Sequence, residues 1–166
     1  MIPWVSFVGY SDSGKTTIVA KMVAIFKERG YRVAAIKHAA HGYDMDVPGK
    51  DSWQHYRAGA DQVILAGVES ISSHQRCAEP PSLIDALSLV KDVDIILVEG
   101  FKSEAGPKIE IIRQEKSSEP MANTSELLAI VSDVSLQTDV PVFEHEKLDL
   151  LADFLANHLH LARGAQ

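Results

Sequence analysis

The sequence has 166 residues, of which 46% are hydrophobic and 23% are charged, and its formal net charge is -7. A chain of this length and apolar content can bury a core, and its mixed charges argue against disorder. The acidic balance argues against a protein that coats nucleic acid or an anionic membrane. Cys77 is the single cysteine, which excludes an intramolecular disulfide and a cysteine zinc cluster and favours a reducing compartment.

No apolar run reaches the roughly 18 residues that a membrane-spanning helix needs. A first strand that is expected to begin at Ile2 leaves no room for a secretory leader. We therefore expect a cytoplasmic protein, with neither nucleic acid nor a membrane among its partners.

The predicted elements alternate between strands and helices from the N-terminus onward. Residues 2–8 and 32–37 are apolar runs typical of buried strands, and the pattern that starts at Thr17 and stops at Gly30 is helical. Such a βαβ unit requires a right-handed crossover and a parallel sheet. Further along we expect strands at 62–66, 69–74, 93–98, 108–112 and 127–131, helices at 51–58, 83–90 and 148–161, and a polar loop at 117–125. Because no repeat or linker is visible, residues 1–166 are expected to form one domain.

The turn after the first strand matches G-x-x-x-x-G-K-[ST] in full, from Gly9 to Thr16. Glycines let the backbone curl so that successive N–H groups converge on phosphate oxygens, and the following helix adds the positive end of its dipole. In this pattern Lys15 reaches the β- and γ-phosphates of a nucleotide, and the hydroxyl of Thr16 binds Mg²⁺. The predicted phosphate-binding residues are Gly9, Ser11, Asp12, Ser13, Gly14, Lys15, Thr16 and Thr17. The fold class that follows is α/β, a three-layer P-loop NTPase fold with a mostly parallel central sheet.

A carboxylate at the end of a neighbouring buried strand normally orients the magnesium shell in such proteins. Glu99 follows the strand expected at 93–98 and is the candidate for both the metal and the catalytic role. Its side chain is one methylene longer than that of Asp, which suits action through a metal-bound water or on the attacking water. Asp94 lies about 16 Å away at the start of the same strand, so we expect it to be a solvated strand end.

The segment from His38 to Ser52 loses all periodicity and is longer than a plain connection needs, which favours a functional role. It leaves the carboxyl end of a strand, where ligands bind in open α/β sheets. Lys37 is expected to add positive charge to the phosphate site. Asp46 is a second candidate for magnesium binding and catalysis, with Asp44 as the alternative for the magnesium shell. A zinc site is the alternative, but zinc requires a tighter set of ligands with second-shell support. We expect His38 and His41 to be polar loop residues near the nucleotide or a substrate.

Three segments resemble the molybdopterin-guanine dinucleotide biosynthesis protein B family: GYSDSGKTT, IKHAAHGYDMDVPGKDSWQHYRAGA and ILVEGFK, which begin at Gly9, Ile36 and Ile96. The resemblance weakens after about Gln114. It implies a homodimeric GTP-binding protein with weak GTPase activity, which assists the guanylyltransferase that joins GMP from GTP to molybdopterin. Carried over by motif, the loop residues would bind GTP and Mg²⁺, with Asp46 and Glu99 near the metal and the attacking water.

Guanine preference is implied by the resemblance, because the N-K-x-D motif of many GTPases is absent. The nearest substitute is Ser132-Asp133 after the strand at 127–131. Asp133 is a candidate acceptor for the guanine N1–H and 2-amino groups. The alternative is that Asp133 simply ends its strand.

Two other functions stay open. A P-loop small-molecule kinase would need an acceptor pocket, a base and an arginine-bearing lid, and no such lid is visible. Of the arginines, only Arg57 follows the functional loop closely, so slow hydrolysis is expected. A non-hydrolysing binding module, in which nucleotide orders a partner surface, would use the same residues.

Overall fold

A computed structural model describes residues 1–44, 46–115 and 125–162, and the chain divides into two compact units. The first unit comprises Met1–His38 and Leu83–Gln166, and the second comprises Ala39–Ser82. That residues 1–166 act as one domain stays a prediction. Apart from Ser125, the loop predicted at 117–125 lies outside the described residues.

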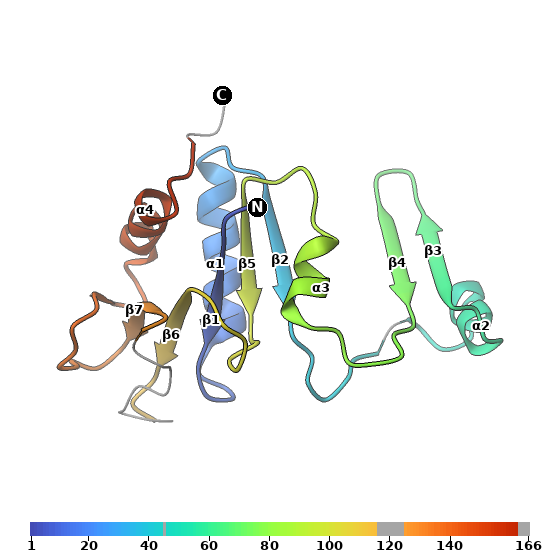
Figure 1. Cartoon of the computed structure of the whole chain (residues 1–166), viewed down its shortest axis with the longest axis horizontal. Coiled ribbons are helices and arrows are strands. Elements are labelled where there is room, and N and C mark those ends of the chain that lie inside the picture. Colours follow the sequence, from blue (N-terminus) through green and yellow to red (C-terminus); the bar gives the residue numbers. More distant parts are fainter. Residues whose placement is uncertain (45, 116–124, 163–166) are drawn as a thin grey trace. The chain divides into compact units, whose positions relative to one another are not determined.

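The first unit is built on a six-stranded parallel sheet in the order β2-β5-β1-β6-β7-β8 (Figure 1). Its strands are β1 Trp4–Val8, β2 Val33–Lys37, β5 Ile95–Glu99, β6 Lys108–Ile112, β7 Leu127–Ser132 and β8 Val142–Phe143. The prediction of an α/β fold with a parallel central sheet is confirmed. Strand β8 was not predicted, because two residues are too few to show a pattern.

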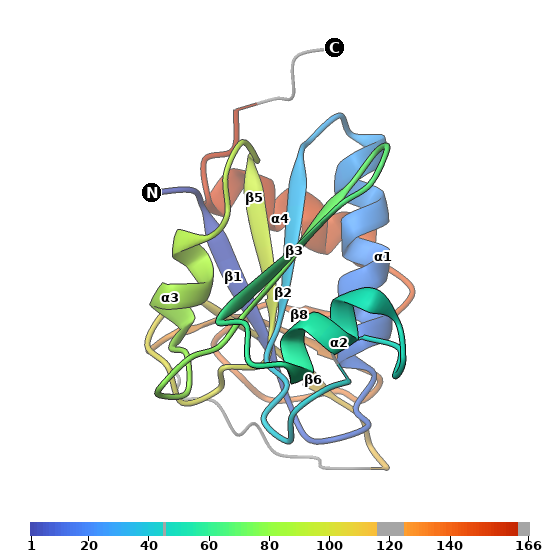
Figure 2. The same cartoon turned by 90° about the vertical axis from the view of Figure 1, so that its right-hand side faces the viewer.

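Helices cover both faces of this sheet (Figure 2). In β5, Ile95 and Leu97 pack in the cluster of the first face, whereas Ile96 and Val98 pack with Leu83 on the second. Apolar side chains on both faces are what a parallel sheet covered by helices requires. The helices are α1 Lys15–Glu28 and α4 Leu148–His158 on the first face and α3 Leu83–Ser88 on the second. In the described part of the chain, no helix has the length and apolar character to cross a membrane.

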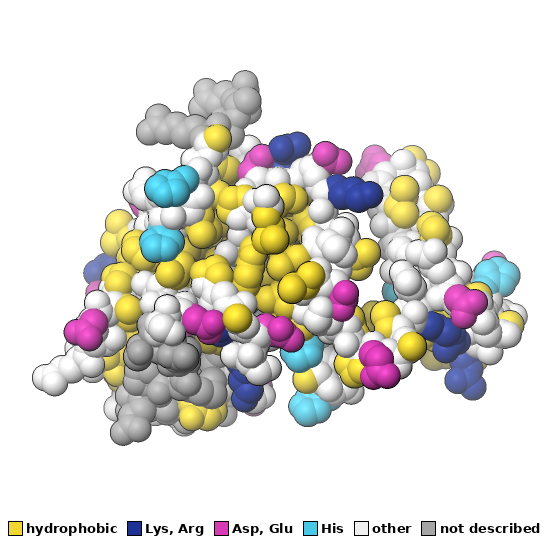
Figure 3. Space-filling model, in the orientation of Figure 1, with side chains coloured by type: hydrophobic (Ala, Val, Ile, Leu, Met, Phe, Trp, Pro, Cys, Tyr) yellow, Lys and Arg dark blue, Asp and Glu magenta, His cyan; other side chains and the backbone are white. Residues whose placement is uncertain are grey.

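The face that carries α3 is thinly covered. Hydrophobic side chains gather on it in the space-filling view (Figure 3), and Trp4, Ile84 and Leu87 help to line a cavity of about 410 Å³ there. Ile84 is 74% exposed although it lies on α3. Within the first unit, α3 is the helix on this face, and its six residues make it shorter than the helix predicted at 83–90.

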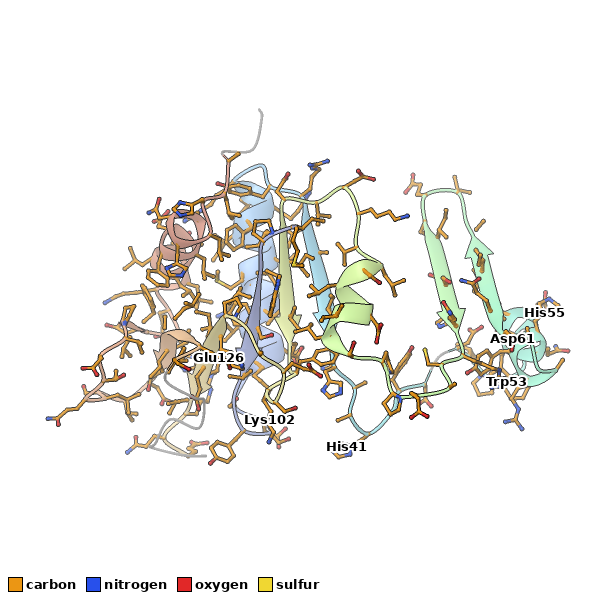
Figure 4. The ribbon with its side chains drawn as sticks, in the orientation of Figure 1. His41, Trp53, His55, Asp61, Lys102 and Glu126 are labelled. Carbon is orange, nitrogen blue, oxygen red and sulfur yellow. The ribbon has the colours of Figure 1, made fainter. Side chains whose placement is uncertain are left out.

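The second unit contains one helix and one antiparallel hairpin, namely α2 Asp51–Arg57, β3 Gln62–Ala66 and β4 Ile71–Gln75. Trp53 and His55 lie on α2, as Figure 4 shows. The guanidinium of Arg76, just after β4, lies 3.8 Å from the centre of the Tyr56 ring and donates to the Tyr56 carbonyl at 2.6 Å. These contacts fasten the end of the hairpin to α2.

Candidate functional site

The loop Gly9–Gly14 leaves the carboxyl end of β1 and depends on glycine at both ends. Gly9 has a φ of +147°, and a Cβ placed on it would lie 2.5 Å from the carbonyl oxygen of Ile111. Gly14 has a φ of +89°, directly before the first residue of α1. Because glycine alone adopts such angles at little cost and lacks the clashing atom, the loop keeps this shape only with the residues of the motif.

Ser13 lies inside this loop and is 1% exposed. Its backbone N–H donates to the carbonyl of Tyr10 at 3.3 Å, but its Oγ atom has no hydrogen-bond partner within the described residues. A buried hydroxyl without a partner is costly, and the same is true of the Ser6 hydroxyl inside β1.

Lys15 begins α1 and turns its ammonium group back over the loop. The Nζ atom donates to the carbonyl oxygens of Gly9 at 3.2 Å and of Tyr10 at 2.5 Å. Carbonyl oxygens carry only partial charge, so within the described residues no full negative charge is bonded to the ammonium. An anionic group in the loop would supply that charge.

Burial has the largest influence on the ammonium of Lys15, followed by the carboxylates of Glu99 and Asp12 and then by the ammonium groups of Lys37 and Lys102. Burial lowers the pKa of the Lys15 ammonium, and the neighbouring charges of Lys37 and Lys102 act in the same direction. The carboxylates of Glu99 and Asp12 oppose this shift and raise the pKa. Lys102, which was not selected from the sequence, lies near the carboxyl end of β1 in Figure 4. This edge of the sheet is therefore suited to an anion.

Glu99 joins three elements at that edge. The Thr16 hydroxyl donates to Glu99 Oε1 at 2.7 Å, and Lys37 Nζ donates to the same oxygen at 3.2 Å. The parallel register aligns Glu99 with Phe7 of β1 and with Lys37 of β2. This alignment brings the side chains of Glu99 and Lys37 together at the ends of their strands. Hydroxyl and carboxylate oxygens are ligands that Mg²⁺ accepts. The proximity of Thr16, Lys37 and Glu99 agrees with their predicted roles, which themselves stay predictions.

The chain turns sharply after Glu99. Gly100 has a φ of +100°, and a Cβ placed on it would lie 2.9 Å from the Cβ of His38. The His38 ring stacks on that of Phe101 with 4.2 Å between centres. The backbone N–H of His38 donates to the Glu99 carbonyl at 2.9 Å. His38 thus supports the position of Glu99, a packing role that the sequence did not reveal.

Asp46 belongs to the second unit, where it has partners of its own. Its carboxylate accepts hydrogen bonds from the hydroxyl of Ser52 and, at 2.7 Å, from the N–H of Val47. Both bonds lower the pKa of Asp46, and the bond from Ser52 has the larger effect. Its predicted magnesium and catalytic roles stay predictions. Among the residues that the structure describes, no group of three or more His, Cys, Asp or Glu is placed to hold a metal ion.

Asp133 follows β7 at the carboxyl-end edge of the first unit. Its Oδ1 atom accepts a hydrogen bond from the N–H of Gln114 at 2.9 Å, which ties the chain after β6 to the chain after β7. The side chain is exposed. It therefore fills a strand-end role, and its role toward guanine stays a prediction.

Arg113 is the second cation that sequence reasoning missed. Its Nε atom donates to the carbonyl of Ser13 at 3.2 Å, across 100 positions of sequence. The available signal, a basic residue directly after an apolar strand, is common and carries little specificity. Only the pairing of β6 with β1 places Arg113 beside the loop.

A parallel α/β sheet with a glycine-rich loop between its first strand and first helix defines the P-loop NTPase class of fold. Within that class, the family model for molybdopterin guanine dinucleotide synthesis protein B matches residues 4–133. A molybdopterin-guanine dinucleotide biosynthesis adapter protein from Haemophilus influenzae is 39% identical over 169 residues, covering 99% of this chain and 94% of that protein. The adapter protein of Escherichia coli is 34% identical over 170 residues, covering 99% and 97%.

Solved structures agree with these sequence matches. The crystal structure of a MobB protein homolog from Bacillus stearothermophilus superposes with a TM-score of 0.71 at 28% identity, covering 96% of this chain and 99% of that one. The chain therefore belongs to the molybdopterin guanine dinucleotide synthesis protein B family. The resemblance inferred from the three sequence segments is confirmed.

Proposed function

We propose that this chain is an adapter protein in molybdopterin-guanine dinucleotide biosynthesis and that it binds GTP with Mg²⁺ at the Gly9–Gly14 loop. The relatives described as adapter proteins of this pathway support the first part. The observation that carries the second part is the loop itself. Its two glycines, its buried Ser13 hydroxyl without a partner and the ammonium of Lys15 together fit the phosphates of a nucleotide.

In this proposal each residue of the site has a definite task. The N–H groups of the loop from Gly9 to Gly14, with the hydroxyl of Ser13, donate to phosphate oxygens, and Lys15 moves from the loop carbonyls to the phosphates. Thr16 and Glu99 hold Mg²⁺, which when bound neutralises phosphate charge. Lys37 fixes the Glu99 carboxylate and balances its charge, since its ammonium lies 3.2 Å from that carboxylate.

The finer assignments belong to the same proposal. Asp133 accepts from guanine, and Asp46 supplements Glu99 at the metal. The partner is the molybdenum cofactor guanylyltransferase, and the chain works as a homodimer in the cytoplasm with slow hydrolysis. What supports these assignments is family membership together with the position of Asp133 at the edge of the sheet that carries the loop.

The adapter role is tested by reconstitution. A purified guanylyltransferase of this pathway is given molybdopterin, GTP and Mg²⁺, with and without the chain, and the guanine dinucleotide formed is measured. We expect the chain to raise the yield and Lys15→Ala to remove the increase. An equal yield in all three reactions would contradict the adapter role. Acceptor-dependent phosphoryl transfer at tens of turnovers per second by the chain alone would favour the kinase alternative.

A further inference from the structure

The guanidinium of Arg113 lies against the phosphate loop. Its Nε atom donates to the Ser13 carbonyl at 3.2 Å. A Cβ placed on Gly14 would lie 3.2 Å from that Nε atom and 3.3 Å from Nη2. The arginine therefore contacts the loop at the two residues that directly precede Lys15, and Gly14 gives it the space to do so.

Arg113 differs from the other described arginines in its partners. Arg29 and Arg32 form ion pairs with carboxylates, and the guanidinium groups of Arg57 and Arg76 lie over aromatic rings. Within the described residues, the bonds of Arg113 go to the Ser13 carbonyl and the ring of His145, which leaves the guanidinium without a carboxylate.

Those two bonds use two of the five N–H donors that a guanidinium carries. The side chain is half-buried, which limits how far water can replace the remaining bonds. A guanidinium whose remaining donors meet no anion among the described residues matches phosphate oxygens in geometry and in charge. Its place beside Ser13 and Gly14 puts those donors at the phosphate loop.

His145 holds this guanidinium from the other side. The ring is 7% exposed, with Nε2 3.3 Å from the carbonyl of Ile112 and Nδ1 3.5 Å from Nη2 of Arg113. A carbonyl only accepts hydrogen bonds, so we assign the ring proton to Nε2. The Nδ1 atom then accepts from Arg113, and the ring connects the end of β6 to the cation.

We propose that Arg113 is a further phosphate-binding residue of this site and that His145 is the positioning residue that orients its guanidinium. The inference rests on the proposed nucleotide binding and adds a cation to it from a strand outside the motif. Arg113 donates its remaining N–H groups to the phosphates of the bound nucleoside triphosphate.

The test is the affinity for Mg²⁺-GTP, measured by calorimetric titration of the wild type and of five variants. Arg113→Ala is expected to weaken binding by about ten- to a hundredfold, as for the loss of hydrogen bonds to a charged group. Arg113→Lys keeps the positive charge but loses the paired N–H donors of the guanidinium. Its affinity for Mg²⁺-GTP is expected to lie between those of the wild type and of Arg113→Ala. Arg32→Ala, the same change at the opposite edge of the sheet, is expected to leave the affinity within about twofold, which is normal for a screened surface charge.

The positioning role is tested by two substitutions at one position. In His145→Asn the amide oxygen takes the place of Nδ1 and still accepts from Arg113, whereas His145→Leu removes the acceptor. We expect the Asn variant to bind GTP at least about fivefold more tightly than the Leu variant, since one hydrogen bond contributes about 1 kcal/mol. Thermal unfolding without nucleotide verifies that each variant is folded.

The outcomes separate the two levels of the proposal. Undetectable GTP binding by the wild type would contradict the proposed function and this inference together. Wild-type binding with unchanged affinity in folded Arg113→Ala and Arg113→Lys would overturn the inference alone. Equal losses in the two His145 variants would show that the histidine acts through Ile112 and does not orient the arginine.

Discussion

The two edges of the parallel sheet in the first unit differ in how their charged side chains are paired. At the edge where the strands begin, the buried Lys108 pairs with Glu126, and Arg32 pairs with Asp94 at 2.8 Å. Each of these pairs links the starts of two neighbouring strands. Cation and carboxylate there satisfy each other inside the protein.

At the edge where the strands end, charge pairing is incomplete. Lys15 donates to backbone carbonyls, Arg113 donates to a carbonyl and lies near a histidine, and the buried Ser13 hydroxyl has no partner within the described residues. The carboxylate of Glu99 is shared by Thr16 and Lys37. The charged pairs of the first edge are complete within the protein, whereas the second edge leaves cations bonded to uncharged acceptors, which is why we propose that it binds an anionic ligand together with Mg²⁺.

The largest expected effect is on binding at the second edge. Lys15→Ala is expected to weaken Mg²⁺-GTP binding by about a hundredfold, because a hydrogen-bonded charge on the phosphates is lost. The stability of the nucleotide-free protein is expected to change little, since in the part of the chain that the structure describes Lys15 bonds only to backbone carbonyls. Calorimetric titration measures the first effect and denaturant unfolding the second. If Lys15→Ala binds GTP as tightly as the wild type, the Gly9–Gly14 loop is not the nucleotide-binding site.

Next in size is the loss of stability from the first edge. Lys108→Met is expected to destabilise the protein by on the order of 2 kcal/mol, because buried acceptors lose their donor. Among these acceptors is the carbonyl of Glu104, 2.7 Å from the ammonium. GTP affinity is expected to remain within about twofold, since the contact lies at the opposite edge. If the GTP affinity of Lys108→Met falls together with its stability, the first edge does not serve stability alone, which contradicts the division of roles between the two edges.

A smaller effect is expected at Glu99. Glu99→Gln keeps an oxygen that accepts from Thr16 but removes the charge. We expect GTP affinity to fall by no more than about threefold and Mg²⁺-dependent phosphate release to fall by about tenfold, which corresponds to about 1.4 kcal/mol of activation free energy. Phosphate release under saturating GTP is the measurement. Equal losses of affinity and hydrolysis would show that Glu99 serves binding alone.

The smallest effect concerns acid stability at the first edge. The pKa of Asp94 is lowered from 3.8 to about 2 in the folded protein. The largest cause is the hydrogen bond from the Arg32 side chain, followed by that from the Arg32 backbone. Asp94 therefore contributes stability that is complete above pH 3.8 and is lost as the pH falls through about 2. Unfolding of the wild type and of Asp94→Asn between pH 6 and pH 2 is expected to show a stability difference that shrinks toward acid. A difference independent of pH would contradict the ion pair.

Much of the second edge was predictable because it rests on local sequence. The apolar runs that became β1 and β5, and the motif between Gly9 and Thr16, are each contiguous, so each could be found in the sequence. The proximity of Glu99 to Thr16 was predicted because P-loop proteins normally carry a carboxylate at the end of a neighbouring strand. The rule that parallel strands end at one edge then predicted their proximity to Lys37.

The missed residues depend on contacts between distant segments. Arg113 meets Ser13 only because β6 pairs with β1, and His145 follows a strand of two residues that leaves no pattern in the sequence. The packing of His38 against Phe101 was also hidden, since it depends on the positive φ of Gly100 and Phe101. The division that sets off Ala39–Ser82, with Asp46, was also missed, because no repeat or linker marks it in the sequence.

The most direct test of the central claim is thermal unfolding of the wild-type protein with GTP, ATP and GDP, with and without Mg²⁺. At a ligand concentration of about 100 times the dissociation constant, we predict that Mg²⁺-GTP stabilises the protein by about 2.7 kcal/mol. We also predict that ATP at the same concentration stabilises it less. An unfolding midpoint that GTP leaves unchanged at millimolar concentration would contradict the claim that the carboxyl-end edge of the sheet is a nucleotide site.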